Sequence, residues 1–208
     1  MSWYPLHIQL DGRKCLVVGG GPVAARKARG LLRGGATVKV VAPRISEAMR
    51  DLVASDSVEL VERRYEQSDL DGITLAVTAT DDPGINELVY SQGESAGVLV
   101  NSADDPENCR FILPAVIRRG PVTVTVSTGG ASPAMAAILK GRLEEEIGEE
   151  WGVLTELMSE ARDRLHERGH STEGMEEKWK AAASNDVLEM IRAGDLEAAR
   201  RRIADCLS

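Results

Sequence analysis

The sequence predicts an α/β fold in three parts: an N-terminal domain with a parallel sheet, a short strand-helix segment and a helical C-terminal region. Two observations predict it. Short β-branched runs alternate with amphipathic stretches of helical length between residues 6 and 101, as in a sheet covered by helices on both faces. Strand-like runs become few after residue 101, and after Gly148 the chain is charged and helical in pattern. We therefore expect domains over residues 1–113, 114–148 and 149–208.

The first domain is expected to alternate strands and helices in chain order. Glycine bounds the apolar run of the first strand, and the next helix begins at that glycine-rich turn. Ser46 is a cap for the second helix, and Asp81 or Asp82 followed by Pro83 marks the start of the third. The expected strands cover residues 15–18, 37–42, 58–61, 73–78 and 98–100, and the expected helices cover 23–33, 46–54 and 82–97.

The rest of the chain offers fewer strand signals. Phe111–Leu113 and Val122–Val126 are expected as strands, the second because Val and Thr alternate along it. Ser132 and Pro133 mark the start of a helix that runs to about Ile147. The remaining residues are expected to be helical, with an interruption near residues 169–174.

Composition and charge narrow the class of protein. The 208 residues carry 33 acidic and 25 basic side chains, a formal charge of −8, which disfavours nucleic acid or an anionic membrane as a partner. The uncharged stretch 120–139 contains paired glycines and a Ser-Pro pair, so we expect no membrane span there. No signal-peptide pattern is visible, and three scattered cysteines indicate neither disulfides nor a metal site, so we expect a cytoplasmic protein.

A glycine-rich segment stands between the first expected strand and the first expected helix. Gly19, Gly21 and Ala24 fit the pattern G-x-G-x-x-A. In that pattern the first glycine permits a tight turn, the second lets backbone approach a pyrophosphate, and the alanine lets the helix pack close to the sheet. The placement predicts a Rossmann-type domain that binds a dinucleotide, and a glycine turn without a ligand is the alternative.

The choice of dinucleotide stays open on these residues alone. Domains that bind NAD often end their second strand with a carboxylate that holds the ribose hydroxyls. Here Pro43 and Arg44 stand there instead. Arg44 is suited to the 2′-phosphate of NADP, or to a position beside the adenine or the pyrophosphate.

Acidic residues follow the last strand of the expected sheet. The segment from Asn101 to Pro106 includes Asp104 and Asp105, and ligands bind at the carboxyl ends of parallel strands. An aspartate there can take a proton as hydride leaves a substrate. Turn formation also explains Asp-Asp-Pro, and spacing alone favours that interpretation.

Hydroxyl groups and glycines precede the helix of the middle segment. Ser127, Thr128, Gly129 and Gly130 can receive substrate carboxylates just before that helix begins. A simpler interpretation is that the two glycines make a bend and Ser132 caps the helix, and both interpretations can hold together.

Two further patterns suggest metal ions but have simpler explanations. His166-Glu167-Arg168-Gly169-His170 matches the zinc pattern H-E-x-x-H, yet Gly169 weakens the helix that the pattern requires. The acidic run Glu144–Glu146 is typical of a solvated helical face. We expect no metal site at either place.

In this order the segments resemble the N-terminal half of siroheme synthases and their stand-alone relatives, the precorrin-2 dehydrogenases. The likeness covers essentially the whole chain. It rests on five blocks, at residues 15–28, 79–82, 101–105, 111–115 and 126–133.

The resemblance implies what the residues alone leave open. It implies a homodimer that oxidises precorrin-2 to sirohydrochlorin with NAD⁺ rather than NADP⁺, and some members of the family also insert Fe²⁺ into the product. It implies that Asp104 is the catalytic aspartate. The expected cofactor contacts are Gly19, Gly21, Pro22, Val23, Pro43, Arg44, Thr80 and Asn101, and the expected substrate contacts are Ser127, Thr128, Gly129 and Gly130.

Two other functions are weighed against this one. An NAD-sensing regulatory dimer shares the glycine loop but does not call for the residues from Asn101 to Pro133. A generic small-molecule dehydrogenase is disfavoured because the sequence has no Tyr-x-x-x-Lys pair.

Overall fold

The computed structural model describes residues 3–55, 58–103, 105, 109–171 and 173–208. It contains two compact units, residues 1–112 and residues 113–208. Each unit has a core of its own. The finer division of the second unit at residue 148 stays a prediction.

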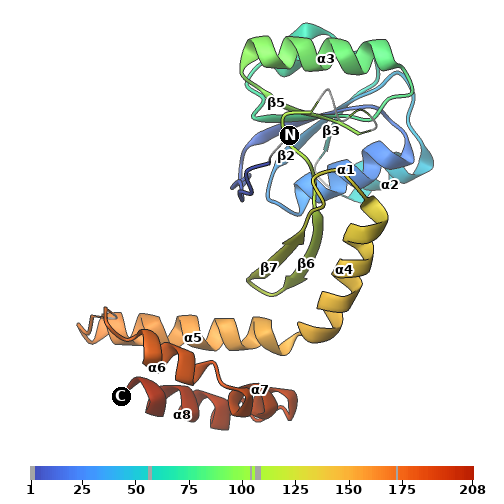
Figure 1. Ribbon diagram of the computed structural model, residues 1–208. Coiled ribbons are helices and arrows are strands. Elements are labelled where there is room, and N and C mark those ends of the chain that lie inside the picture. The colour runs from blue at the N-terminus through green and yellow to red at the C-terminus, as the bar shows by residue number, and fades with distance from the viewer. Residues whose placement is uncertain (1–2, 56–57, 104, 106–108, 172) are drawn as a thin grey trace. The chain divides into compact units, whose positions relative to one another are not determined.

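The first unit is built on a five-stranded parallel sheet with the order β3-β2-β1-β4-β5 (Figure 1). The chain adds strands on one side of β1 and then returns to its other side at β4. The strand order therefore reverses between β1 and β4, which is where open α/β sheets bind their ligands. The strands are β1 (Lys14–Val18), β2 (Thr37–Val41), β3 (Val58–Val61), β4 (Leu75–Thr78) and β5 (Leu99–Ser102).

Helices cover both faces of this sheet, which confirms the predicted α/β fold. Successive residues of β1 point to opposite faces, so Cys15 packs in one apolar core and Leu16 in the other. Helices α1 (Pro22–Leu32) and α2 (Glu47–Ser55) cover the first face, and α3 (Pro83–Ala96) covers the second (Figure 1). This double burial is why the strand has no polar alternation. A short 3₁₀ helix, η1 (Gln67–Leu70), lies between β3 and β4.

The predicted caps are present at two helix starts. Ser46 Oγ accepts a hydrogen bond from the backbone nitrogen of Met49 (3.3 Å) at the start of α2. Asp82 Oδ1 accepts from the backbone nitrogen of Gly84 (3.0 Å) at the start of α3. Gly97 ends α3 with a φ of +71°, a conformation that favours glycine.

The described residues of the second unit form a hairpin and five helices. Strands β6 (Ala115–Arg119) and β7 (Val122–Val126) pair antiparallel. An apolar core that includes Leu154, Val187 and Ile203 holds the last four helices together. The helices are α4 (Pro133–Glu146), α5 (Glu150–Glu167), α6 (Glu176–Ala182), α7 (Asn185–Arg192) and α8 (Leu196–Leu207).

The expected strand at Phe111–Leu113 is wrong, and the strand β6 begins at Ala115 instead. Phe111 is held to the first unit, because its backbone oxygen accepts a hydrogen bond from Asn101 Nδ2 (2.9 Å) and its ring packs on the core. Pro114 has no N–H for a ladder. Strand β6 itself ends in two arginines, which weakened its apolar signal.

Candidate functional site

The loop after β1 lies directly against the loop after β4. Gly19 has a φ of +131°, and its backbone nitrogen donates to the backbone oxygen of Val41 (3.0 Å). A Cβ at this position would stand 2.3 Å from the backbone oxygen of Ala79. Only glycine fits both the dihedral angle and the space, as the predicted tight turn requires.

The same loop lies equally close to the segment after β2. A Cβ on Gly20 would stand 2.0 Å from the backbone oxygen of Arg44, and the oxygen of Gly20 accepts from the backbone nitrogen of Ser46 (2.8 Å). Sequence reasoning missed Gly20, because it is a variable position of the pattern. The signal was a third glycine in a row where the pattern asks for two.

Gly21 faces open space, unlike the two glycines before it. It is the N-cap of α1, its φ is −76°, and a Cβ there would meet nothing within 4 Å. No side chain caps this helix end, and Pro22 occupies the first turn. Ala24 is fully buried and lets the helix pack against the sheet. A bare helix N-terminus beside a closely packed glycine turn fits the pyrophosphate of a dinucleotide.

The other expected cofactor contacts lie at the same edge of the sheet. Pro43 and Arg44 are exposed just after β2, and Val23 is half-buried in the first turn of α1. Thr80 is half-buried after β4, and its hydroxyl donates to Asn86 Oδ1 (2.9 Å) and accepts from the backbone nitrogen of Asp82 (3.2 Å). The structure therefore brings these residues together, and the Thr80 hydroxyl also braces the start of α3.

A hydrogen bond joins Asn101, in β5, to Cys109, which follows it by eight residues. Asn101 Nδ2 donates to Cys109 Sγ (3.4 Å) as well as to Phe111. The Cys109 thiol donates to the backbone oxygen of Ser102 (3.2 Å), and burial raises its pKa, so the thiol keeps its proton. The segment between them carries the predicted base, but Asp104 lies outside the described residues.

Three buried polar atoms at this edge have no hydrogen-bond partner within the described part of the chain. They are Thr78 Oγ1, Asn101 Oδ1 and Ser102 Oγ. Thr78 and Ser102 are register partners at the ends of β4 and β5. Buried polar atoms are usually paired, so three orphans at the carboxyl ends of adjacent strands indicate a place for a bound polar group.

The expected substrate contacts belong to the second unit, where they form a tight turn before α4. The Thr128 hydroxyl accepts from the backbone nitrogen of Ser132 (3.1 Å) and donates to its oxygen (3.0 Å). The backbone nitrogen of Gly129 donates to Ser127 Oγ (3.1 Å), and Gly130 has a φ of +88°. The bend is therefore present, and Ser132 Oγ caps α4 by accepting from the backbone nitrogen of Met135 (3.2 Å). Substrate contact stays a prediction.

The H-E-x-x-H pattern does not lie on one helical face. Helix α5 ends at Glu167, and Gly169 turns the chain with a φ of +76°. The backbone nitrogen of His170 donates to the backbone oxygen of Leu165 (3.0 Å), which is the hydrogen bond of a Schellman turn. His166 is thus helical and His170 lies beyond the helix, so the spacing that favours zinc is lost.

Two family models match this chain, and curated relatives match nearly all of it. Residues 6–115 match the family model described as "Putative NAD(P)-binding", and residues 119–146 match the one described as "Sirohaem biosynthesis protein central". A siroheme synthase of Chromobacterium violaceum is 38% identical over 96% of this chain, and one of Nitrosococcus oceani is 37% identical over 96%. The chain spans 43% and 42% of the lengths of these two relatives.

A solved structure matches the chain over nearly its whole length. It is named "SirC, precorrin-2 dehydrogenase", and it is 27% identical to this chain with a TM-score of 0.79. The match covers 98% of this chain and 100% of that protein. No helix in the described ranges has the length and apolar character to cross a membrane.

Proposed function

This chain belongs to the NAD(P)-binding family whose model matches residues 6–115 and is a homologue of siroheme synthases, and from that premise we propose that it oxidises precorrin-2 to sirohydrochlorin with NAD⁺. The match to a precorrin-2 dehydrogenase over 98% of this chain is the observation that supports it most. It reaches beyond the dinucleotide domain and includes the second unit.

The glycine loop supports the dinucleotide half of the proposal. The backbone around Gly19 and Gly20 is packed too closely for any side chain, while Gly21 and the start of α1 stay open. These features leave room for a pyrophosphate beside bare backbone N–H donors.

Bound NAD⁺ supplies the acceptor for the hydride that leaves the macrocycle. The residues of the chain then have two tasks, to orient the reacting groups and to receive the proton that is released with the hydride. We assign the proton to a carboxylate oxygen of Asp104, in the segment after β5. Asn101 and Cys109, on either side of that residue in the sequence, are joined by a hydrogen bond from Asn101 Nδ2 to Cys109 Sγ.

We propose NAD rather than NADP as the cofactor. The resemblance to siroheme synthases supports this choice, although Arg44 at the end of β2 is the residue that would favour a 2′-phosphate. Parallel titrations with NAD⁺ and NADP⁺ decide between them, and we expect tighter binding of NAD⁺.

A homodimer is part of the same proposal. Helix α4 has no buried residue, and Met135 and Ile138 on it are 46% and 52% exposed. Apolar side chains exposed on one helix are typical of a surface that another chain covers. Substrate carboxylates are assigned to Ser127, Thr128, Gly129 and Gly130, with exposed Arg118 as a further cation.

The experiment is an anaerobic assay with precorrin-2 and NAD⁺, in which formation of sirohydrochlorin and NADH is followed by absorbance. Fe²⁺ is then added as a second substrate, to test insertion of iron. Formation of NADH supports the dehydrogenase. Intact NAD⁺ binding without turnover overturns it and favours the NAD-sensing regulatory dimer.

A further inference from the structure

A cavity of about 420 Å³ lies in the helical part of the second unit, among α5, α6 and α8. Leu157, Ile203 and Leu207 line it, and all three belong to the apolar core of these helices. These three side chains are 4%, 1% and 5% exposed, so the floor of the cavity is apolar and well packed. Its volume is within the range of about 300–1,000 Å³ of small-molecule sites.

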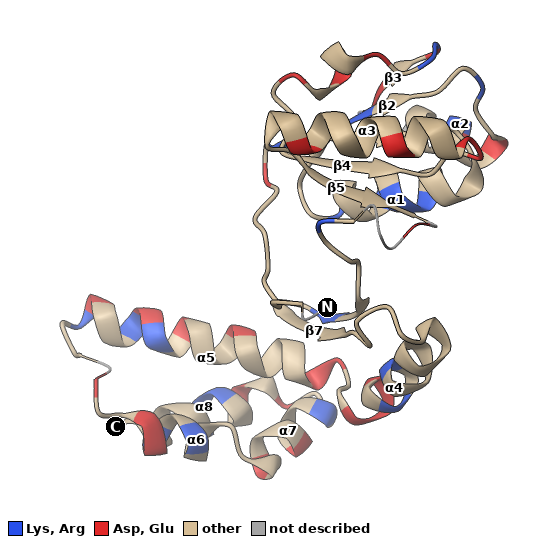
Figure 2. Cartoon of the chain, turned by 45° about the horizontal axis from the view of Figure 1, so that its top comes forward, with Lys and Arg blue, Asp and Glu red and all other residues tan. Residues whose placement is uncertain are grey.

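Basic side chains surround this apolar floor. Arg164, Arg168, Lys178 and Arg200 line the cavity, and Glu160 is the one carboxylate side chain among the described lining residues. Basic residues on α5, α6 and α8 are visible in Figure 2. The excess of cations is local, because residues 140–208 as a whole carry 17 acidic and 11 basic side chains.

Acidic groups balance the cations of this rim only in part. Arg164 Nη2 lies 3.2 Å from Glu160 Oε2, and Arg200 Nη1 contacts the same oxygen. Two guanidinium groups therefore share the charge of Glu160, and Arg200 Nε also lies 3.9 Å from Glu197 Oε1. Lys178 Nζ contacts a main-chain carboxyl oxygen of Ser208, the last residue of the structure, whereas the described part of the chain contains no ion pair of Arg168.

Two residues of the H-E-x-x-H segment, Arg168 and His170, line this cavity. Gly169 ends α5 and reverses the chain, and His170 then becomes a lining residue beside Arg168. A histidine and four cations repel a metal ion, but they suit an anion.

We propose that this cavity binds an organic carboxylate with an apolar body. The apolar floor would bury the body, and Arg168 and Lys178 would pair with the carboxylate at the rim. A fatty acid and a tetrapyrrole with carboxylate side chains share this chemistry. The inference goes beyond the proposed dehydrogenase, since it concerns residues of α5, α6 and α8 alone.

The test measures binding to the full chain by calorimetry, without NAD⁺ or precorrin-2. The probes are decanoate, decanol of the same chain length, and coproporphyrin. We expect decanoate or coproporphyrin to bind at a single site, and decanol to bind at least about tenfold more weakly than decanoate. Binding of decanoate identifies a fatty-acid type of ligand, and binding of coproporphyrin alone identifies a tetrapyrrole.

Variants locate the binding. The double variant Arg168→Ala/Lys178→Ala should weaken carboxylate binding by about tenfold or more. Ala204→Trp should abolish it, because Ala204 is an exposed lining residue and a large ring there fills the mouth. The matched control is Arg162→Ala/Arg201→Ala, exposed on α5 and α8 but outside the lining, which should bind as the unaltered chain does.

Thermal melting by circular dichroism confirms that each variant is folded. The proposal is overturned if neither carboxylate probe binds. It is also overturned if a folded Ala204→Trp variant, or the double variant at the rim, binds as tightly as the unaltered chain.

Discussion

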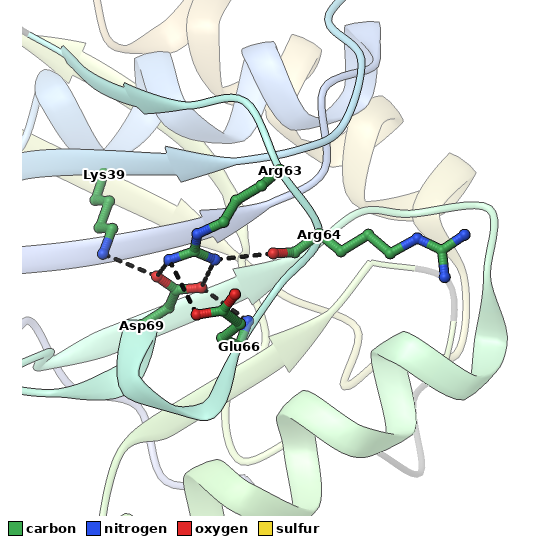
Figure 3. A network of polar contacts seen from close by, with 5 residues as sticks. All are labelled: Lys39, Arg63, Arg64, Glu66 and Asp69. Atoms are coloured by element: carbon green, nitrogen blue, oxygen red, sulfur yellow. Dashed lines mark hydrogen bonds and ion pairs between the residues drawn. The ribbon is translucent and has the colours of Figure 1, made fainter.

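The guanidinium group of Arg63 donates two hydrogen bonds, each 2.8 Å long, to the buried carboxylate of Asp69 (Figure 3). Lys39 Nζ on β2 lies 2.9 Å from the same carboxylate, and the backbone nitrogen of Glu66 donates to it at 2.9 Å. Asp69 is 1% exposed. This carboxylate therefore ties β2 and the segment after β3 to η1, on the α3 side of the sheet.

Replacement of this carboxylate should destabilise the first unit. Asp69→Asn keeps the size but loses the charge that pairs with Arg63 and Lys39, and we expect a loss of about 2–3 kcal/mol in the free energy of unfolding. Urea unfolding followed by circular dichroism measures it. The control is Asp71→Asn, two residues away and exposed, which should change stability by less than about 0.5 kcal/mol. Equal losses in both variants would contradict a special role for Asp69.

The same carboxylate should make stability depend on pH. Burial alone would raise the pKa of Asp69, but hydrogen bonds from Arg63, the Glu66 backbone and Lys39 outweigh it and hold the pKa well below its usual range. The stabilisation is thus present above the unfolded pKa of about 3.9 and is lost as pH falls below it. The difference in stability between the unaltered chain and Asp69→Asn should shrink by about 1.3 kcal/mol from pH 7 to about pH 3. A difference that stays constant over this range would contradict the prediction.

Substitution of Gly21 should weaken NAD⁺ binding, whereas substitution of its neighbour Gly20 should lower the stability of the fold. Gly21→Asp has room for its side chain but puts a negative charge at the start of α1, so we expect a folded protein that binds NAD⁺ at least about tenfold more weakly. Gly20→Ala forces a Cβ onto the Arg44 backbone, so we expect a loss of about 1–3 kcal/mol in stability. Calorimetry and urea unfolding separate the two effects. If a folded Gly21→Asp variant binds NAD⁺ with unchanged affinity, the pyrophosphate does not bind beside Gly21.

Replacement of Asp104 tests whether the chain is a dehydrogenase or an NAD-sensing regulatory dimer. Asp104→Asn cannot take a proton, so dehydrogenation should fall by about 10²- to 10⁴-fold while NAD⁺ still binds. Asp105→Asn is the control and should lose much less, because the resemblance assigns the base to Asp104 and not to its neighbour. Initial rates of NADH formation measure both, and iron insertion, if present, should fall with Asp104. Full turnover in Asp104→Asn with collapse in Asp105→Asn would show that the neighbour is the base.

The exposed side chains of α4 should be covered in a dimer. Light scattering should give about twice the chain mass of 22.4 kDa. Ile138→Glu should lower this mass toward the monomer, since it puts a charge on an apolar surface. Glu145→Gln, exposed on the same helix, should leave the mass unchanged. A clean monomer of the unaltered chain at micromolar concentration would argue against the dimer.

Local signals in the sequence determined most of the first unit. The run Cys15–Val18 has apolar residues at every position because both faces of the strand are buried, and this pattern is visible without a structure. Ser46 and Asp82 cap their helices through backbone groups only two or three residues away. The glycine pattern likewise predicted the turn at the start of α1, because its dihedral angles and its helix end are local properties.

The tertiary structure alone decided the features that depend on distant residues. Gly20 must be glycine because the backbone of Arg44, in the segment after β2, approaches it. Strand β6 forms because β7 pairs with it, despite its two arginines. Lys39, Arg63 and Asp69 follow no periodic pattern, and only the fold of the sheet brings their charges together. The same holds for His170 and the basic rim of the helical cavity. Sequence patterns report the neighbours of a residue along the chain, whereas packing and ion pairs depend on neighbours in space.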